Sequence, residues 1–173
     1  MSSLDYNVEM NTLYVHNISM RVRHMIKACC GFGHREVFHN ISAEVYNAVL
    51  DAAEQGCTVF YTGAMGEFDM IFSSAVRQVK LQKPLIKLIC VQPYLTQKII
   101  EDREYIYSLY DDIIVPTELA DIHPKAIITK RNQWMIRHSD LVLVYTIRDY
   151  GGAYNAMRYA ERQNKQVIRL HGI

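Results

Sequence analysis

The chain has 173 residues, of which 50% are apolar and 21% are charged, and its formal net charge is +1. This length suits one domain with its own core, and a charge near zero gives no overall field that attracts nucleic acid or a membrane surface. No stretch approaches the roughly 18 apolar residues of a membrane span, and no secretory apolar region opens the chain. We therefore expect a cytoplasmic protein that has neither membrane nor nucleic acid as a partner.

The first 24 residues are polar and aperiodic, which favours a poorly ordered tail ahead of a domain spanning residues 25–173. The residues from Met25 to Cys30 read as a first strand, which ends in a loop with two glycines. Apolar residues at helical spacing follow over 41–55, and Gly56 suits the end of that helix. A β-branched and aromatic strand over 58–61 then leads into a second glycine loop.

The rest of the chain continues this alternation of helices and short apolar strands. The expected helices cover 68–81, 95–109, 124–138 and 153–163, and the expected strands cover 85–91, 113–115, 141–145 and 166–170. Strand and helix in alternation, with short connections, are typical of a parallel sheet covered on both faces. The sequence therefore predicts one Rossmann-like, doubly wound α/β domain with a mainly parallel sheet.

Four cysteines stand in or beside these apolar runs, and none of them has the C-x-x-C spacing of a redox or zinc motif. They are Cys29, Cys30, Cys57 and Cys90. Cysteine without such spacing is most often a small buried side chain. We therefore interpret all four as buried free thiols in a reducing compartment.

Glycines recur in three of the predicted strand-to-helix loops. They are Gly31 and Gly33 after the first strand, Gly63 and Gly66 after the second, and Gly151 and Gly152 after the fifth. In a parallel sheet these loops share one edge, where ligands bind near the point at which strand order reverses. Glycine lets backbone N–H groups approach a ligand, and the following helix N-terminus favours an anion. The alternative for each loop alone is an ordinary tight turn.

Polar side chains near these loops are candidates for contacts with a ligand. His34 and Arg35 follow the first glycine loop, where an arginine at a helix entrance can hold a phosphate; the alternative is a solvated pair. Asp69 lies in the first turn of its helix, either stabilising the helix dipole or binding a ribose or base. Arg131 and Asn132 lie in mid-helix, where asparagine is not favoured and a polar role is plausible.

The sequence gives no sign of a metal or cofactor site. His34 and His39 are five residues apart with no third ligand nearby, which does not fit metal-binding spacing. The 12 tyrosines are scattered and are not interleaved with basic residues, so they form no stacking platform for single strands. We therefore expect no metal and no cofactor.

The order of these motifs resembles the SLOG superfamily, most closely its single-domain YpsA-like branch, which is similar in fold to DprA/Smf and LOG proteins. The motifs span residues 25–170, and the likeness lies in their order. They are Cys30-Gly31-Phe32-Gly33-His34-Arg35, Thr62-Gly63-Ala64-Met65-Gly66-Glu67-Phe68-Asp69, Pro93, Gln97, Arg131-Asn132-x-x-Met135, Ser139-Asp140, Gly151-Gly152-Ala153 and Tyr159-Ala160.

The resemblance implies a Rossmann-like domain that recognises nucleotides or their derivatives. With it, the candidate ligand-binding residues are Gly31, Gly33, His34, Arg35, Thr62, Gly63, Ala64, Gly66, Asp69, Gln97, Arg131, Asn132, Gly151 and Gly152. LOG relatives commonly pair, which implies a homo-oligomer.

LOG members are phosphoribohydrolases, which release a base from a nucleoside monophosphate, and the resemblance carries their catalytic residues over only in part. Arg131 matches their arginine, whereas Arg158 stands at the place of their catalytic glutamate, and the later glycine and threonine of their loop are absent. A carboxylate stabilises the oxocarbenium-like transition state of glycosidic cleavage, and a cation does the reverse. Glu101 also stands where the family has a tryptophan after Gln97.

Three functions stay open from the sequence. The first is binding or sensing of a nucleotide-derived small molecule in the glycine loops. The second is hydrolysis of a nucleoside monophosphate, with Arg131 on the phosphate and Glu67 or Asp69 at the sugar. The third is DprA-like binding of single-stranded DNA, which the near-neutral charge disfavours because such binding depends on phosphate neutralisation.

Overall fold

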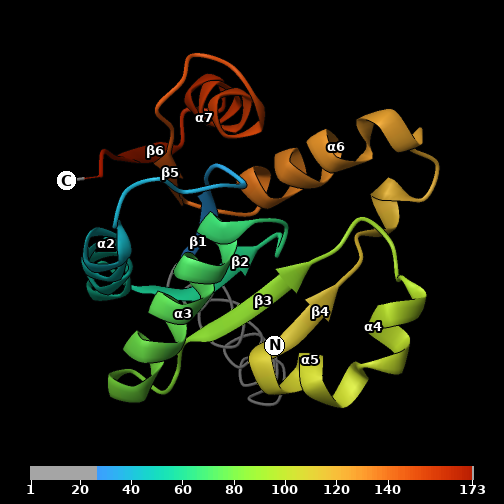
Figure 1. The fold of residues 1–173 in the computed structure, drawn as a ribbon, viewed down its shortest axis with the longest axis horizontal. Helices are drawn as coiled ribbons and strands as arrows, with labels where there is room; N and C mark the ends of the chain where they lie inside the picture. Colours follow the sequence, from blue (N-terminus) through green and yellow to red (C-terminus); the bar gives the residue numbers. More distant parts are fainter. Residues whose placement is uncertain (1–26, 173) are drawn as a thin grey trace, which may run out of the picture.

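The structure is a computed structural model that describes residues 27–172, so the predicted tail of residues 1–24 lies outside the described residues. Six parallel strands form one sheet in the order β4-β3-β2-β1-β5-β6 (Figure 1). The strands are β1 (Lys27–Phe32), β2 (Cys57–Thr62), β3 (Lys87–Val91), β4 (Asp112–Ile114), β5 (Leu141–Tyr145) and β6 (Gln166–Leu170). The predicted Rossmann-like parallel sheet is confirmed.

Helices cover both faces of the sheet, as in other doubly wound folds. They are α2 (Ser42–Glu54), α3 (Glu67–Gln82), α4 (Gln97–Glu101), α5 (Arg103–Leu109), α6 (Pro124–Arg137) and α7 (Gly152–Arg162), with a short 3-10 turn, η1 (Thr117–Leu119). In Figure 1, α2 and α3 lie together on one side and α6 and α7 on the other. Within residues 27–172, no helix is long and apolar enough to cross a bilayer.

The strands alternate their side chains between two buried layers, because successive residues of a strand point to opposite faces. Cys29, Leu141 and Leu143 pack with α2 and α3, whereas Cys30 and Val142 pack with α6 and α7. This double burial explains why β5 is apolar throughout. All four cysteines are free and buried, as expected, and burial raises the pKa of Cys30 to about 12.

Strand order reverses between β1 and β5. The chain builds outward from β1 to β4, then returns through α6 to place β5 on the other side of β1, with Phe32 beside Val144. Since all strands are parallel, the loops after β1, β2 and β5 reach the same edge of the sheet. That edge, at the reversal, is where open α/β sheets bind ligands.

Two parts of the sequence prediction need correction. The helix expected over 95–109 is two short helices, α4 and α5, with a break at Asp102, and α5 contains no buried residue that would enforce a single axis. Arg35 does not stand at a helix entrance of its own strand-to-helix connection. The helix after β1 begins only at Ser42, so residues 33–41 form a longer loop.

That loop passes over the start of α3 rather than leading directly into α2. The backbone oxygen of Arg35 accepts a hydrogen bond from the N–H of Glu67, at 2.9 Å. A Cβ at Gly33 would lie 2.1 Å from the Phe68 ring, so only glycine allows this approach between the loop and α3. The first and second glycine loops are therefore packed against each other.

Candidate functional site

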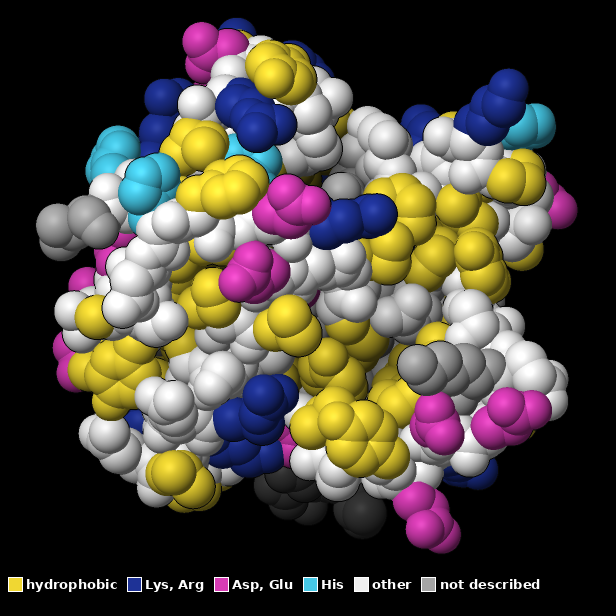
Figure 2. Space-filling view, viewed as in Figure 1, with side chains coloured by type: hydrophobic (Ala, Val, Ile, Leu, Met, Phe, Trp, Pro, Cys, Tyr) yellow, Lys and Arg dark blue, Asp and Glu magenta, His cyan; other side chains and the backbone are white. Residues whose placement is uncertain are grey.

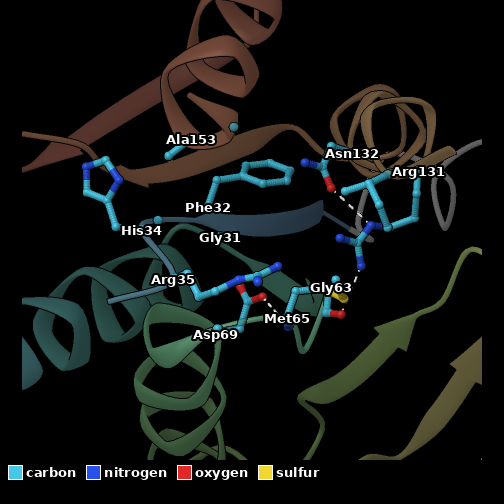
Figure 3. A pocket seen from close by; sticks show the side chains of 14 residues that line it. Gly31, Phe32, His34, Arg35, Gly63, Met65, Asp69, Arg131, Asn132 and Ala153 are labelled. Carbon is cyan, nitrogen blue, oxygen red and sulfur yellow. Dashed lines mark hydrogen bonds between the residues drawn. The ribbon is translucent and has the colours of Figure 1, made fainter. Parts of the chain in front are cut away.

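A pocket of about 260 Å³ opens at the carboxyl edge of the sheet, at the reversal of strand order (Figure 3). Residues from all three glycine loops and from α6 line it. They are Gly31, Phe32, Gly33, His34 and Arg35 from β1 and its loop, Gly63, Met65, Gly66 and Asp69 from the second loop and α3, Ile128, Arg131 and Asn132 from α6, and Gly152 and Ala153 from α7. The structure thus brings together most of the predicted site residues, in one concave place.

Arg131 is the polar residue buried deepest in this pocket, with a side chain only 3% exposed. Its Nη1 donates hydrogen bonds to the backbone oxygens of Gly63, at 2.9 Å, and Val91, at 3.0 Å, and its Nε donates to Oδ1 of Asn132. A Cβ at Gly63 would lie 2.4 Å from Nη1. Gly63 therefore makes room for the guanidinium, which fastens α6 to the ends of β2 and β3.

The second guanidinium nitrogen of Arg131 remains available to the pocket. Nη2 has no hydrogen-bond partner among residues 27–172. Burial lowers the pKa of Arg131 while the nearby Asp69 raises it, and a guanidinium stays protonated in proteins despite such a shift. Arg131 therefore brings a fixed positive charge to a largely dry position.

Asp69 faces the same pocket from the first turn of α3. Its Oδ2 accepts a hydrogen bond of 2.7 Å from the N–H of Met65, which closes the second glycine loop (Figure 3). Burial raises the pKa of this carboxyl, and the opposing effects of the Met65 N–H and Arg131 do not cancel that rise. Asp69 thus holds its proton to a higher pH than an exposed aspartate does.

Helix α7 points its N-terminus at the pocket without a side-chain cap. Gly151 precedes the helix with φ +95°, and Gly152 and Ala153 of the first turn line the pocket. The first N–H groups of a helix have no partner within it and carry the positive end of the helix dipole. The first turn of α7 contains no acidic residue. This end of the pocket is therefore suited to an anion.

His34 and Arg35 extend from the β1 loop in different directions. Nε2 of His34 accepts a hydrogen bond of 3.0 Å from the N–H of Ile147, so the ring is neutral and ties this loop to the one after β5. Burial, followed by the charge of Arg148, lowers the His34 pKa. Figure 3 shows the imidazole lying away from Arg131, whereas Arg35 and Arg131 reach the pocket from different sides.

Five predicted residues lie near the pocket or beyond it but do not line it. The carboxylate of Glu67 accepts a hydrogen bond from the N–H of Val37, at 2.8 Å, and Gln97 is exposed and bonded to Glu101. Thr62 is fully buried beneath its loop, and Ala64 turns outward with φ 52°. Gly151 sets the direction of α7 rather than facing the cavity.

Four lining residues were not among the sequence candidates: Phe32, Met65, Ile128 and Ala153. Three of them are direct neighbours of predicted glycines, but an apolar residue in a loop carries no separate signal. Ile128 lies three residues before Arg131 on α6, so helical spacing places it on the same face. Among residues 27–172, no three His, Cys, Asp or Glu side chains lie close enough to hold a metal ion.

If Arg131 fastens α6 to the sheet, its replacement by methionine costs stability. Arg131→Met keeps the unbranched apolar stem of the side chain but loses the guanidinium and its two hydrogen bonds to backbone oxygens. We expect the free energy of unfolding to fall by about 2 to 4 kcal/mol. Urea unfolding measures it. Arg137→Met, an exposed position on the same helix, is the control and should change stability by about 0.5 kcal/mol or less. Equal values for the two variants would contradict the assignment.

Asp69→Asn tests the raised pKa. Because the folded state binds the Asp69 proton more tightly than the unfolded state, ionisation lowers the stability of the wild type as pH rises through the two pKa values. Asparagine still accepts from Met65 but carries no charge. We expect Asp69→Asn to melt above the wild type at pH 7, and this advantage to shrink as pH falls through the folded-state pKa. A difference in melting temperature that does not change with pH would count against the buried, destabilised carboxylate.

The fold is similar to that of three solved proteins. DNA processing protein A (DprA) from Helicobacter pylori, described for its single-stranded DNA binding mode, has 17% identity and a TM-score of 0.59 over 84% of this chain and 66% of that one. DprA from Streptococcus pneumoniae has 17% identity and a TM-score of 0.59, over 86% of this chain and 51% of that one. A molybdenum cofactor carrier protein from Chlamydomonas reinhardtii has 15% identity and a TM-score of 0.51, over 83% and 75%.

In sequence, no protein-family model and no curated protein matches the chain. The chain spans about two thirds of the length of one DprA and about half of the other. Identities this low show a common fold alone.

Proposed function

We propose that the pocket binds the phosphate end of a nucleotide or nucleotide-derived small molecule, and that the chain is a binding or sensing module of the SLOG type. The observation that carries the proposal is the meeting of three glycine loops around one buried arginine, at the reversal of strand order. Backbone N–H groups, a helix N-terminus and a guanidinium are the groups that hold phosphate in α/β folds.

The phosphate fits best between the start of α7 and Arg131. The N–H groups of the first turn of α7 face the pocket at Gly152 and Ala153, and Nη2 of Arg131 has no partner among residues 27–172. Arg35 adds a second, exposed guanidinium from the β1 loop. These positive groups are local, which agrees with a protein whose total charge is only +1.

The remainder of the pocket suits a sugar or base. The Oδ1 of Asn132 accepts from Arg131, which leaves the amide NH₂ to donate, and Asp69 offers a carboxyl group. Phe32, Met65 and Ile128 supply apolar surface. The volume of about 260 Å³ lies just below the range for small-molecule sites, which begins at about 300 Å³. It therefore suits one mononucleotide unit.

Hydrolysis of a nucleoside monophosphate is the alternative, and the site favours it less. Of the two carboxylates weighed for it, Asp69 lines the pocket, whereas Glu67 is bonded to the Val37 backbone. The place of the LOG glutamate holds Arg158, so the carboxylate that would stabilise an oxocarbenium-like transition state is missing there, and Arg158 itself does not line the pocket. Base release in the wild type that Asp69→Asn abolishes, with ligand affinity retained, would favour the enzyme.

Single-stranded DNA is the second alternative, because one neighbour of similar fold is described as binding it. Fluorescence anisotropy with a labelled oligo-dT at low salt tests this directly. Affinity for DNA depends strongly on salt, since binding releases counterions. Salt-dependent binding of the oligonucleotide, in the absence of any response to mononucleotides, would replace the small-molecule proposal.

A thermal-shift screen tests the proposal itself, with AMP, GMP, CMP, UMP and ribose 5-phosphate at millimolar concentration. Binding to the folded state alone raises the melting temperature, and the rise grows with the logarithm of the affinity. We expect at least one of these monophosphates to do so. If none of them shifts the midpoint, the proposal is wrong, whatever the fold.

The variant Gly152→Ala tests whether the phosphate binds at the start of α7. A Cβ at Gly152 meets no atom within 4 Å, so the folded chain accepts it, and alanine is the better helix former. The added methyl group would stand where a ligand approaches the start of α7. We expect an unchanged or higher melting temperature without ligand, and an affinity at least tenfold weaker, or about 1.4 kcal/mol, by calorimetry. Full affinity in this variant would exclude the start of α7 as the phosphate site.

A further inference from the structure

A second cavity adjoins the first, in the groove between α6 and α7. Its volume is about 290 Å³, and it shares Ile128, Asn132 and Gly152 with the pocket described above. The two cavities therefore meet at the start of α7, and a molecule bound in the first can continue into the second.

The lining of this groove is polar along its walls. Thr129 and Gln133 come from α6 and Asn155 from α7, while Ile136 and Ala156 form apolar surface. The side chains of Thr129, Gln133 and Asn155 make no hydrogen bond to any residue in the range 27–172. Their donors and acceptors are therefore free for a ligand, in the manner expected of a site that recognises hydroxyl or amide groups.

Two arginines stand on the α7 side of the groove. They are Arg158 and Arg162, and among the residues that the structure describes no acidic one lines the groove. Figure 2 shows Lys and Arg side chains gathered over α7. Since the whole chain has a net charge of only +1, the positive charge of this groove is local.

Both groove arginines can turn to an anion at small cost. Arg158 pairs with Glu161 at 2.7 Å, but its side chain is 52% exposed, and exposed pairs contribute only about 0 to 1 kcal/mol. Within the described residues Arg162 has no ion pair, and its guanidinium lies 6.0 Å from the ring centre of Tyr159.

The spacing along α7 separates this charge from the first phosphate position. Arg158 follows Gly152 by six residues, which corresponds to about 9 Å along a helix. Two adjacent phosphates of a diphosphate would both remain near the start of α7. A second phosphate at Arg158 must be joined to the first through a sugar or a longer link.

We infer that the ligand is a nucleotide with two separated phosphate groups, one at the glycine loops and one in the α6–α7 groove at Arg158 and Arg162. The inference rests on the proposed function and specifies its ligand class. It also gives a role to Arg158, because a cation in this groove can bind a second phosphate.

Calorimetry with three probes tests the inference: AMP, ADP and adenosine 3′,5′-bisphosphate. We expect the 3′,5′-bisphosphate to bind the wild type at least tenfold more tightly than AMP, and ADP to gain less. In the double variant Arg158→Gln/Arg162→Gln, affinity for the bisphosphate should fall to that of AMP, while affinity for AMP itself stays the same.

Arg169→Gln is the matched control. Arg169 also pairs with Glu161 at 2.7 Å and is 53% exposed, but it does not line the groove. It should leave the affinity for both ligands unchanged. An equal loss in Arg169→Gln would show a general charge effect and overturn the inference.

The outcomes separate this inference from the proposed function. Binding of AMP with no gain for the bisphosphate overturns the inference alone, whereas failure of both ligands to bind overturns both. Affinity that rises steadily with the length of an oligo-dT would indicate that the groove binds nucleic acid, and would also overturn the inference.

Discussion

The guanidinium of Arg131 is the contact on which the candidate site depends. It reaches from α6 to the backbone oxygens of Gly63 and Val91, so it joins the crossover helix to the ends of two strands that come much earlier in the chain. Among residues 27–172, it makes the hydrogen bond that links α6 to the second glycine loop at the base of the pocket. The absent side chain of Gly63 is what allows this approach. The sequence suggested that Gly63 leaves room for a ligand, whereas the structure shows that it leaves room for the guanidinium of Arg131, which in turn lines the pocket.

The positive electrostatic potential of the site follows from a helix N-terminus and one buried guanidinium, rather than from the net charge of the chain. The start of α7 is uncapped and free of acidic residues, and Arg131 holds a buried positive charge nearby. Asp69 is the opposing group, and burial holds its pKa above the usual value. Protonation of Asp69 as the pH falls therefore makes the pocket more favourable to an anion. A protein of almost no net charge can therefore have a positively charged binding site, because Arg131 and the start of α7 are held in place and partly shielded from water.

The fold was predictable because burial on both faces leaves a clear signal: the apolar run Leu141–Tyr145 is β5 from end to end. The meeting of the glycine loops followed from the geometry of parallel sheets. What the sequence could not give depends on contacts between distant residues. Arg35 packs against the start of α3 and not at the start of α2, because its backbone oxygen accepts a hydrogen bond from the N–H of Glu67. The side chain of Glu67 accepts a hydrogen bond from the N–H of Val37 and so does not enter the pocket. The α6–α7 groove forms between two helices that become neighbours only because β5 returns beside β1. No local sequence pattern therefore predicts the groove.

The central claim is that the three glycine loops form one anion site, and an NMR titration tests it most directly. Ribose 5-phosphate, which is common to all ribonucleotides, is added to ¹⁵N-labelled protein while the amide signals are followed. The account predicts that the amides of Gly33, Gly66 and Gly152, from three separate loops, shift together along one saturating curve. Signals that move only on a distant surface, such as the α3 residues Arg77 and Lys80, would contradict it, as would no movement in these loops at millimolar ligand.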